Sequence, residues 1–443
     1  MIITIICAIL LLYGLIQYDK GHYAKSLLIL VFFASSAFII NLGTPVLKYK
    51  DFGLLLLVGY CFIGYKKNSD FFKINSLPGA KISLAFLLFF LFEFLCAYFN
   101  NIDTIGNILA VIRDYLYALT YFAFRKAPVE ELKKGVILIF KAVILACAFF
   151  VLQYFTHIQF TESFISENNL QSGNYRMQSV PPFISIFLLA LLFYFRKIRY
   201  RWGLMLLFLG VLLISQNRTP LIALFLQIGL FILFARNSRY KIQILIVLIL
   251  IFPFIDSVLS SRSEEEGNVK ITDVPIMSYI NSGDYTGLAR QNTFMFRIAL
   301  IAERFDYLVN HPNKALFGVG AMHEDTAQKK FNFVIGTANV GKYGERITGQ
   351  LNSIDVVWGP LLIRYGFIGL MLHLTIIIWI IILFYRRKKE PIMMLGFLTY
   401  VAELTQSFSS GGMFLLVGII TIMGFLIAYE KRINIMQYKI NNH

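Results

Sequence analysis

The sequence predicts an all-α polytopic membrane protein with about 12–13 transmembrane helices and one large, partly helical loop on the outer side of the membrane. Composition is the first reason: hydrophobic residues make up 58% of the 443 residues, and the mean hydropathy is +0.68. The second reason is that apolar runs long enough for a bilayer core follow one another along most of the chain. The third is that nearly all the other residues are collected in a single stretch, from Leu259 to about Val356.

These apolar runs divide the chain into three parts. Residues 1–258 form N-terminal transmembrane helices, 259–356 the large loop, and 357–443 C-terminal transmembrane helices with a short cytoplasmic tail. The expected spans are 2–18, 26–45, 51–65, 82–99, 106–124, 135–155, 180–195, 202–216, 219–235, 241–258, 357–385, 391–408 and 412–429.

The distribution of charge orients these spans. The proposed inner segments hold 24 of the 41 Lys and Arg residues but only 6 of the 25 Asp and Glu residues. Basic residues favour the cytoplasmic side of short loops, so these segments are assigned to the cytoplasm and 259–356 to the outside. The net charge of +16 is therefore explained by topology, and no nucleic-acid partner is expected. Lys48 and Lys50 fall on the outer side, against this rule.

Within the outer loop, the apolar spacing predicts a helix from Gly287 to Asn310, followed by Pro312. Arg290, Arg297 and Arg304 recur on it every seven residues. Seven residues are nearly two turns, so the three side chains are expected to form one stripe. Such a stripe suits a diphosphate, because each guanidinium can donate two parallel hydrogen bonds; a solvated helix face is the alternative.

Arg218 joins two expected spans at the outer surface, within the run Ser215-Gln216-Asn217-Arg218-Thr219-Pro220. An Arg at bilayer depth is costly and usually faces a protein interior or a watery cavity. The alternative is an Arg whose charged end reaches the membrane surface.

Further charged residues lie within the expected spans. All are placed in the outer half of their span, which predicts a polar cavity open to the outside; structural ion pairs between helices are the alternative. Glu93 is the expected partner of Arg113, because the sequence neighbours Arg113 and Asp114 point about 100° apart on a helix. These residues are Glu93, Arg113, Asp114, Arg364 and Glu403.

Three other kinds of site are not indicated by the sequence. The histidines lack the spacing of metal ligands, so no metal is expected, and no nucleotide-binding loop is present. No cofactor is expected. The four cysteines fall inside apolar spans, so no disulfide is expected in the large loop.

Four motifs, in this order, resemble the O-antigen polymerase and ligase superfamily of bacterial inner-membrane glycosyltransferases, over roughly Leu204 to Leu370. The first is the run around Arg218, similar to the family's Ser-x-x-Arg-Thr. The second is the outer-loop helix with a conspicuous Arg, best matched by Arg297. The third is Pro312 followed by Phe317-Gly318-Val319-Gly320, and the fourth is Asp355 through Arg364-Tyr365-Gly366-Phe367-Ile368-Gly369.

This resemblance implies a polymerase that joins undecaprenyl-diphosphate-linked oligosaccharide units on the periplasmic face of the inner membrane. It implies that Arg218 and Arg297 bind the diphosphate, and that Arg290, Arg304 and Arg364 support them. Asp355 is the candidate for orienting or deprotonating the acceptor hydroxyl. The implied partners are the lipid-linked oligosaccharide, the lipid bilayer, a chain-length regulator and a flippase.

Two alternatives come from other classes. A ligase would transfer finished glycan to a lipid or protein acceptor. Many ligases carry a His-Asn pair where this chain has Asp355-Val356, which favours the polymerase. A flippase or transporter would move the lipid-linked sugar without chemistry, but the chain shows no internal repeat of the kind found in many transporters.

Overall fold

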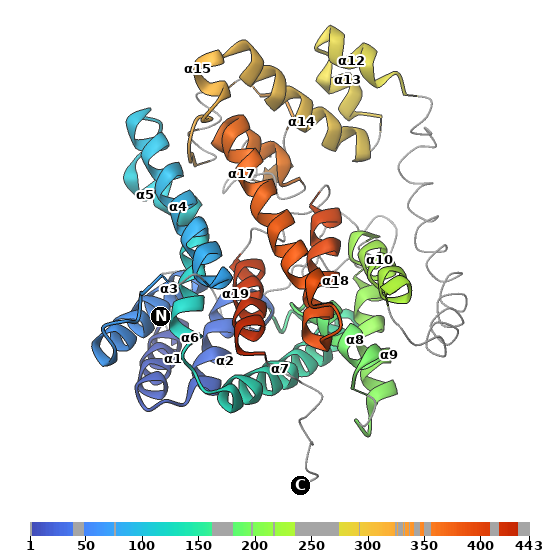
Figure 1. Cartoon of the computed structure of the whole chain (residues 1–443). Coiled ribbons are helices and arrows are strands. Elements are labelled where there is room, and N and C mark those ends of the chain that lie inside the picture. Colours follow the sequence, from blue (N-terminus) through green and yellow to red (C-terminus); the bar gives the residue numbers. More distant parts are fainter. Residues whose placement is uncertain are drawn as a thin grey trace.

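The computed structural model of the chain is helical in the residues that it describes, apart from one short antiparallel hairpin (Figure 1). These residues are 2–38, 48–74, 77–161, 180–195, 198–215, 218–234, 274–291, 293–323, 326, 331, 333–335, 337–340, 346–349, 356–407 and 416–432. The expected span 241–258 therefore lies outside the described residues.

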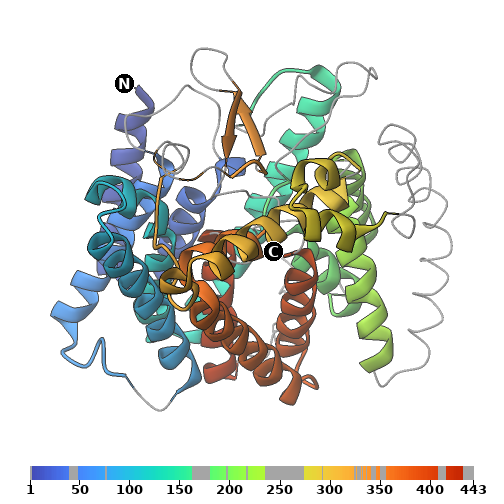
Figure 2. The ribbon, with the colours of Figure 1, turned by 90° about the horizontal axis from the view of Figure 1, so that it is seen from above.

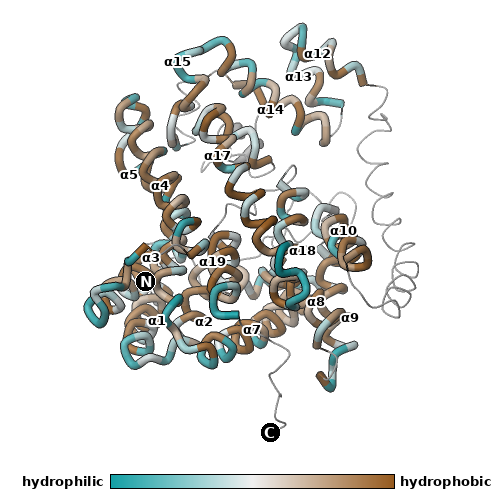
Figure 3. Tube along the Cα trace, viewed as in Figure 1, coloured by the Kyte–Doolittle hydropathy of each residue, from teal (hydrophilic) through white to brown (hydrophobic). Residues whose placement is uncertain are grey.

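Among the described residues, three helices are long and apolar enough to cross a membrane: α4 (Pro78–Phe99), α7 (Val129–Thr156) and α17 (Trp358–Arg386). At 1.5 Å per residue, α4 is about 33 Å long, which matches a hydrocarbon core of about 30 Å. The tube in Figure 3 is hydrophobic along most of α4, α7 and α17, with hydrophilic stretches near the helix ends.

Other helices follow most of the remaining expected spans. They are α1 (Ile2–Asp19), α2 (Tyr23–Ala34), α3 (Tyr49–Lys67), α8 (Ile184–Phe193), α9 (Arg201–Ile214), α10 (Arg218–Phe234), α18 (Pro391–Gln406) and α19 (Leu416–Lys431). The described part of the expected span 26–45 is not one continuous helix, because α2 ends at Ala34 and the 3₁₀ turn η1 (Ser36–Phe38) follows. Residues 39–45 lie outside the described residues.

The expected span 106–124 is not one continuous α-helix. It consists of α5 (Ile105–Ile112), the 3₁₀ segment η2 (Arg113–Ala118) and α6 (Leu119–Phe124). Side chains from neighbouring helices interact with this segment: Ser83 Oγ donates to the carbonyl of Ala118 at 2.7 Å. Tertiary contacts of this kind are not visible in the hydrophobic pattern of a single span.

The large loop supplies α12 (Ile276–Ser282), α13 (Tyr285–Ala289), α14 (Thr293–Asn310) and α15 (Pro312–Ala315), followed by the hairpin of β1 (Thr337–Val340) and β2 (Arg346–Gly349). Figure 1 shows α12–α15 together at one end of the molecule. The prediction of one continuous helix from Gly287 to Asn310 is wrong. The helical structure is interrupted between Ala289 and Thr293, and the long helix of this segment is α14.

Helix α14 packs against the first turns of α17, and in the view from above it lies over that helix (Figure 2). A Cβ atom on Gly359 would meet the side chain of Leu300, so the two backbones approach closely there. Further along, the rings of Phe305 and Phe367 lie 5.5 Å apart in an edge-to-face arrangement. The loop is therefore joined to the apolar helices through the amino-terminal part of α17.

Candidate functional site

Helix α17 is broken at Gly366, whose backbone angles are φ 64° and ψ −167°. The turn that follows α15 bonds the backbone groups around this break. Val319 N–H donates to the carbonyl of Ile363 at 2.9 Å, and Gly320 N–H donates to that of Arg364 at 3.0 Å. Ile368 N–H in turn donates to the carbonyl of Leu316 at 3.1 Å. A break in an apolar helix is tolerated where protein groups satisfy the exposed backbone in this way.

Glycine is required on both sides of this contact. A Cβ atom on Gly366 would lie 2.6 Å from the carbonyl oxygen of Ala315 and from the amide nitrogen of Gly318. Gly318 also has a positive φ, of 74°, and its own Cβ would collide with the carbonyl of Arg364. The structure thus brings the glycine turn and the Arg364–Gly369 segment, the third and fourth motifs of the sequence, into direct contact.

A buried ionic cluster lies next to the break. Glu93, on α4, is fully buried, and its Oε1 atom is 3.5 Å from Nε of Arg364. The hydroxyl of Tyr365 donates a hydrogen bond to the other carboxylate oxygen. A buried charge needs such partners, because desolvation alone would cost several kcal/mol. Glu93 and Arg364 therefore join α4 to α17 at the break.

Two aromatic residues and a histidine continue this cluster. The Nδ1 atom of His373 lies 2.8 Å from the carbonyl of Gly369, which requires Nδ1 to donate and leaves Nε2 as an acceptor. The hydroxyl of Tyr115 lies 3.3 Å from Nε2 and can donate to it. The ring of Phe89 stacks on the imidazole at 3.7 Å. His373 is therefore held by hydrogen bonds and stacking within the packed helices.

The predicted pairing of Glu93 with Arg113 is wrong, since Arg113 forms its ion pair with Asp51 and Glu93 forms its own with Arg364. A second pair joins Lys50 Nζ to Asp114 at 3.1 Å. These crossed pairs connect the start of α3 to η2. The carboxylate of Asp114 offsets the charge of Lys50, one of the two lysines that depart from the expected charge pattern.

A short hydrogen-bonded link holds the glycine turn near α4. Lys314 Nζ donates to Oδ1 of Asn100 at 2.6 Å, and the backbone N–H of His323 donates to Asp103 at 3.0 Å. Partial burial acts to raise the pKa of Asp103. The hydrogen bonds from Asn107, His323 and Thr104 outweigh burial and hold that pKa below its usual value. The carboxylate form of Asp103 is thus favoured in the folded protein.

The three loop arginines do not form the single open stripe that their spacing predicts. Arg290 is exposed at the end of α13, outside α14. Arg304 is fully buried, forms an ion pair with Glu303 at 2.6 Å and lies over the ring of Phe333. Arg297 is half-buried on α14, one turn before Leu300.

Glu303, the ion-pair partner of Arg304, also binds the backbone of a later part of the loop. Its carboxylate accepts hydrogen bonds from the backbone N–H groups of Val334 and Ile335, at 2.5 and 3.0 Å. The pair of Glu303 and Arg304 therefore fastens a later part of the loop onto α14. Arg297 lies on the same helix, α14, which packs against α17.

The amino-terminal end of α17 lies close to the carboxyl-terminal end of α18. Val357 N–H donates to the carbonyl of Ser407 at 3.2 Å, and Glu403 lies one helical turn before Ser407. Asp355 lies outside the described residues; Val356, which follows it, is buried.

The backbone of Arg218 begins helix α10. Helix α10 packs against α18, and the rings of Phe234 and Phe397 near the other end of this contact are 5.6 Å apart. Arg218, the first residue of α10, is 16 residues from Phe234, which corresponds to about 24 Å along the helix.

Several members of the buried cluster could not be identified from the sequence. Tyr115 and His373 are separated by 258 positions, and no periodicity links them. Asp51 lies beside Lys50 at the start of an expected span, so its acidic side chain could have been proposed as a partner for a span arginine. Tyr365 lies inside the Arg-Tyr-Gly motif, which was the available signal.

Comparison with protein-family models finds no matching family, and comparison with curated proteins finds no matching sequence.

Proposed function

We propose that this protein is a multi-pass membrane glycosyltransferase that joins lipid-linked oligosaccharide units on the outer, periplasmic face of the bacterial inner membrane. The proposal includes the orientation inferred from the basic segments, with α12–α15 outside. The donor is a growing glycan on undecaprenyl diphosphate, and the acceptor is a hydroxyl of the next lipid-linked unit.

The observation that supports the proposal most is the convergence at the start of α17. Helix α14, which carries Arg297, packs on that end of α17. The end of α18 with Glu403 is hydrogen-bonded to it, and α10, whose first residue is Arg218, packs against α18. A loop folded over the ends of apolar helices suits a substrate whose lipid lies in the bilayer and whose glycan lies outside.

In the proposed reaction, the protein positions the donor and the acceptor and stabilises the negative charge of the leaving diphosphate. The acceptor oxygen attacks the anomeric carbon of the donor, and the bond from that carbon to the diphosphate oxygen breaks. The bonding electrons leave with the diphosphate, whose negative charge Arg218 and Arg297 stabilise through paired hydrogen bonds. The proton of the acceptor hydroxyl passes to Asp355.

The other charged candidates have different roles in this proposal. Glu93, Arg364, Arg113 and Arg304 hold the helices and the loop in place through the pairs described above. Arg290 is exposed and Glu403 lies near the end of α18, so these two remain candidates for contact with the glycan.

Deletion of the gene from its host tests the proposal. A polymerase deletion should still export and attach single repeat units, and should give a one-unit product in place of a ladder of lengths. Long lipid-linked chains that are never attached would instead indicate a ligase. Single units trapped on the cytoplasmic side would indicate a flippase, and either of these results would contradict the proposal.

A further inference from the structure

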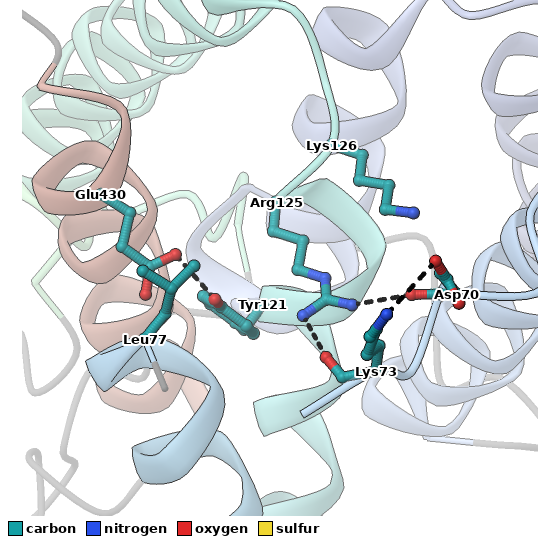
Figure 4. A pocket seen from close by; sticks show the side chains of 7 residues that line it. All are labelled: Asp70, Lys73, Leu77, Tyr121, Arg125, Lys126 and Glu430. Atoms are coloured by element: carbon teal, nitrogen blue, oxygen red, sulfur yellow. Dashed lines mark hydrogen bonds and ion pairs between the residues drawn. The ribbon is translucent and has the colours of Figure 1, made fainter. Parts of the chain in front are cut away.

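A pocket of about 240 Å³ lies at the other end of the helices from α14, between α6, α19 and the segment joining α3 to α4 (Figure 4). The pocket lies near the end of α17 that carries Arg386 and Arg387. The Arg387 guanidinium donates a hydrogen bond to the carbonyl of Tyr429, which precedes the lining residue Glu430 in the chain. The residues that line it are Asp70, Lys73, Leu77, Tyr121, Arg125, Lys126 and Glu430.

The positive charge of this pocket is only partly neutralised. The Arg125 guanidinium donates to the backbone carbonyls of Lys73 at 2.9 Å and Asp70 at 3.1 Å. The carbonyls fix the position of the guanidinium, but they carry no net charge and so do not neutralise its positive charge. Within the described part of the chain, neither Arg125 nor Lys126 forms an ion pair with a carboxylate. Figure 4 shows Arg125, Lys126 and Lys73 grouped on one side of the pocket, with Glu430 on the other.

The two acidic residues are already engaged. Asp70 pairs with Lys73 at 3.7 Å on the exposed rim. Glu430 accepts hydrogen bonds from the N–H of Gly79 at 2.8 Å and from the hydroxyl of Tyr121 at 2.7 Å. Glu430 therefore accepts a hydrogen bond from a backbone N–H in the first turn of α4, where N–H groups without a partner in the helix favour an anion. Three basic side chains against two acidic ones leave the pocket with a positive charge.

Apolar side chains are exposed beside these charges. Phe72 is 41% exposed, Ile74 54% and Leu77 39%, and Lys73 lies among them. Apolar side chains next to a basic one are typical of a segment at a membrane–water interface. These apolar side chains would add no binding energy for free phosphate, whereas the acyl chains of a phospholipid would pack on them.

We propose that this pocket binds the phosphate of an anionic phospholipid from the cytoplasmic leaflet, through Arg125, Lys126 and Lys73. Basic pockets between helices on the cytoplasmic side are suited to such headgroups. The proposal depends on the membrane orientation proposed above, but not on the glycan chemistry, so it can fail or succeed independently of the polymerase assignment.

Thermal unfolding of the purified full-length protein in detergent provides the test, with phosphatidylglycerol, phosphatidylcholine or inorganic phosphate added. Phosphatidylglycerol should raise the unfolding temperature of the wild type, and the other two should not. The double variant Lys73→Gln/Lys126→Gln should bind phosphatidylglycerol at least tenfold more weakly, since each basic side chain near an anionic lipid contributes about 1 kcal/mol. Arg125 is left intact because it also holds the backbone of 70–73.

The matched control is Lys20→Gln/Lys25→Gln, which removes the same charge from exposed lysines outside the pocket. This control should bind phosphatidylglycerol as the wild type does, and both double variants should unfold at the wild-type temperature in phosphatidylcholine. An equal loss of binding in both double variants would show a nonspecific charge effect and overturn the proposal. Equal stabilisation by inorganic phosphate would overturn the lipid assignment.

Discussion

Arg218 begins α10, which packs against α18, and Arg297 lies 79 positions later on α14, which packs against α17. In the proposed mechanism each guanidinium holds diphosphate oxygens with two parallel hydrogen bonds. Lysine keeps the charge but is a point donor that cannot form this forked contact.

We therefore expect Arg218→Lys and Arg297→Lys each to leave protein levels near normal but to abolish long glycan chains, as read from the ladder of glycan lengths. The matched control is Arg386→Lys, an exposed arginine at the opposite end of α17, which should keep the wild-type ladder. Wild-type ladders in both test variants would remove Arg218 and Arg297 from the mechanism.

The buried pair of Glu93 and Arg364 is expected to stabilise the folded protein. Glu93→Gln keeps the shape of the side chain and a hydrogen-bond acceptor for Tyr365, but leaves Arg364 without its carboxylate. Breaking a buried ion pair in this way costs about 3–5 kcal/mol, so the unfolding temperature in detergent should fall clearly.

An exposed pair provides the comparison. Glu130 lies 3.0 Å from Lys133 and its side chain is 63% exposed, so Glu130→Gln should cost less than about 1 kcal/mol. If Glu93→Gln and Glu130→Gln unfold at the same temperature, the Glu93–Arg364 contact does not join α4 to α17.

At the scale of the elements, the break in α17 depends on glycine at position 366. Alanine there would be forced into a backbone conformation that side chains avoid, and its Cβ would collide with the turn after α15. Gly366→Ala should therefore lower the yield of folded protein and its unfolding temperature, and should increase proteolysis of the loop.

Gly210→Ala is the control for this change. A Cβ on Gly210, in α9, would have nothing within 4 Å, and alanine favours a helix over glycine by about 0.5–1 kcal/mol. This variant should be as stable as the wild type or slightly more stable. Equal stability of Gly366→Ala and Gly210→Ala would contradict the close contact between the turn and α17.

Helix positions could be predicted where the hydrophobic pattern alone decides them. The bounds of α4 and α17 differ from the expected spans by only a few residues, since burial of a long apolar run fixes a helix by itself. The 3₁₀ segment η2 and the break at Gly366 could not be predicted, because hydrogen bonds from Ser83 and from the turn at Gly318–Gly320 accompany them. The partners of Glu93 and Arg113 were missed for the same reason: pairing depends on which helices are neighbours.

At the scale of the whole molecule, the proposed orientation of the helices in the membrane can be tested by labelling with a thiol reagent. In a variant without the four native cysteines, a cysteine at the exposed position Asn313 should react with a membrane-impermeant thiol reagent in intact spheroplasts. One at the exposed position Lys389 should react only after the membrane is opened. The reverse pattern would place α12–α15 in the cytoplasm and contradict the proposed periplasmic site.

The proposed polymerase activity is tested most directly with the purified protein in lipid nanodiscs. It would be incubated with an undecaprenyl-diphosphate-linked repeat unit, and the product lengths would be measured by mass spectrometry. We expect products that are integer multiples of the unit, with one undecaprenyl diphosphate released for each bond formed, and no such products with Arg297→Lys. A lipid-linked donor that stays unchanged in length in the presence of folded wild-type protein and acceptor would contradict the assignment.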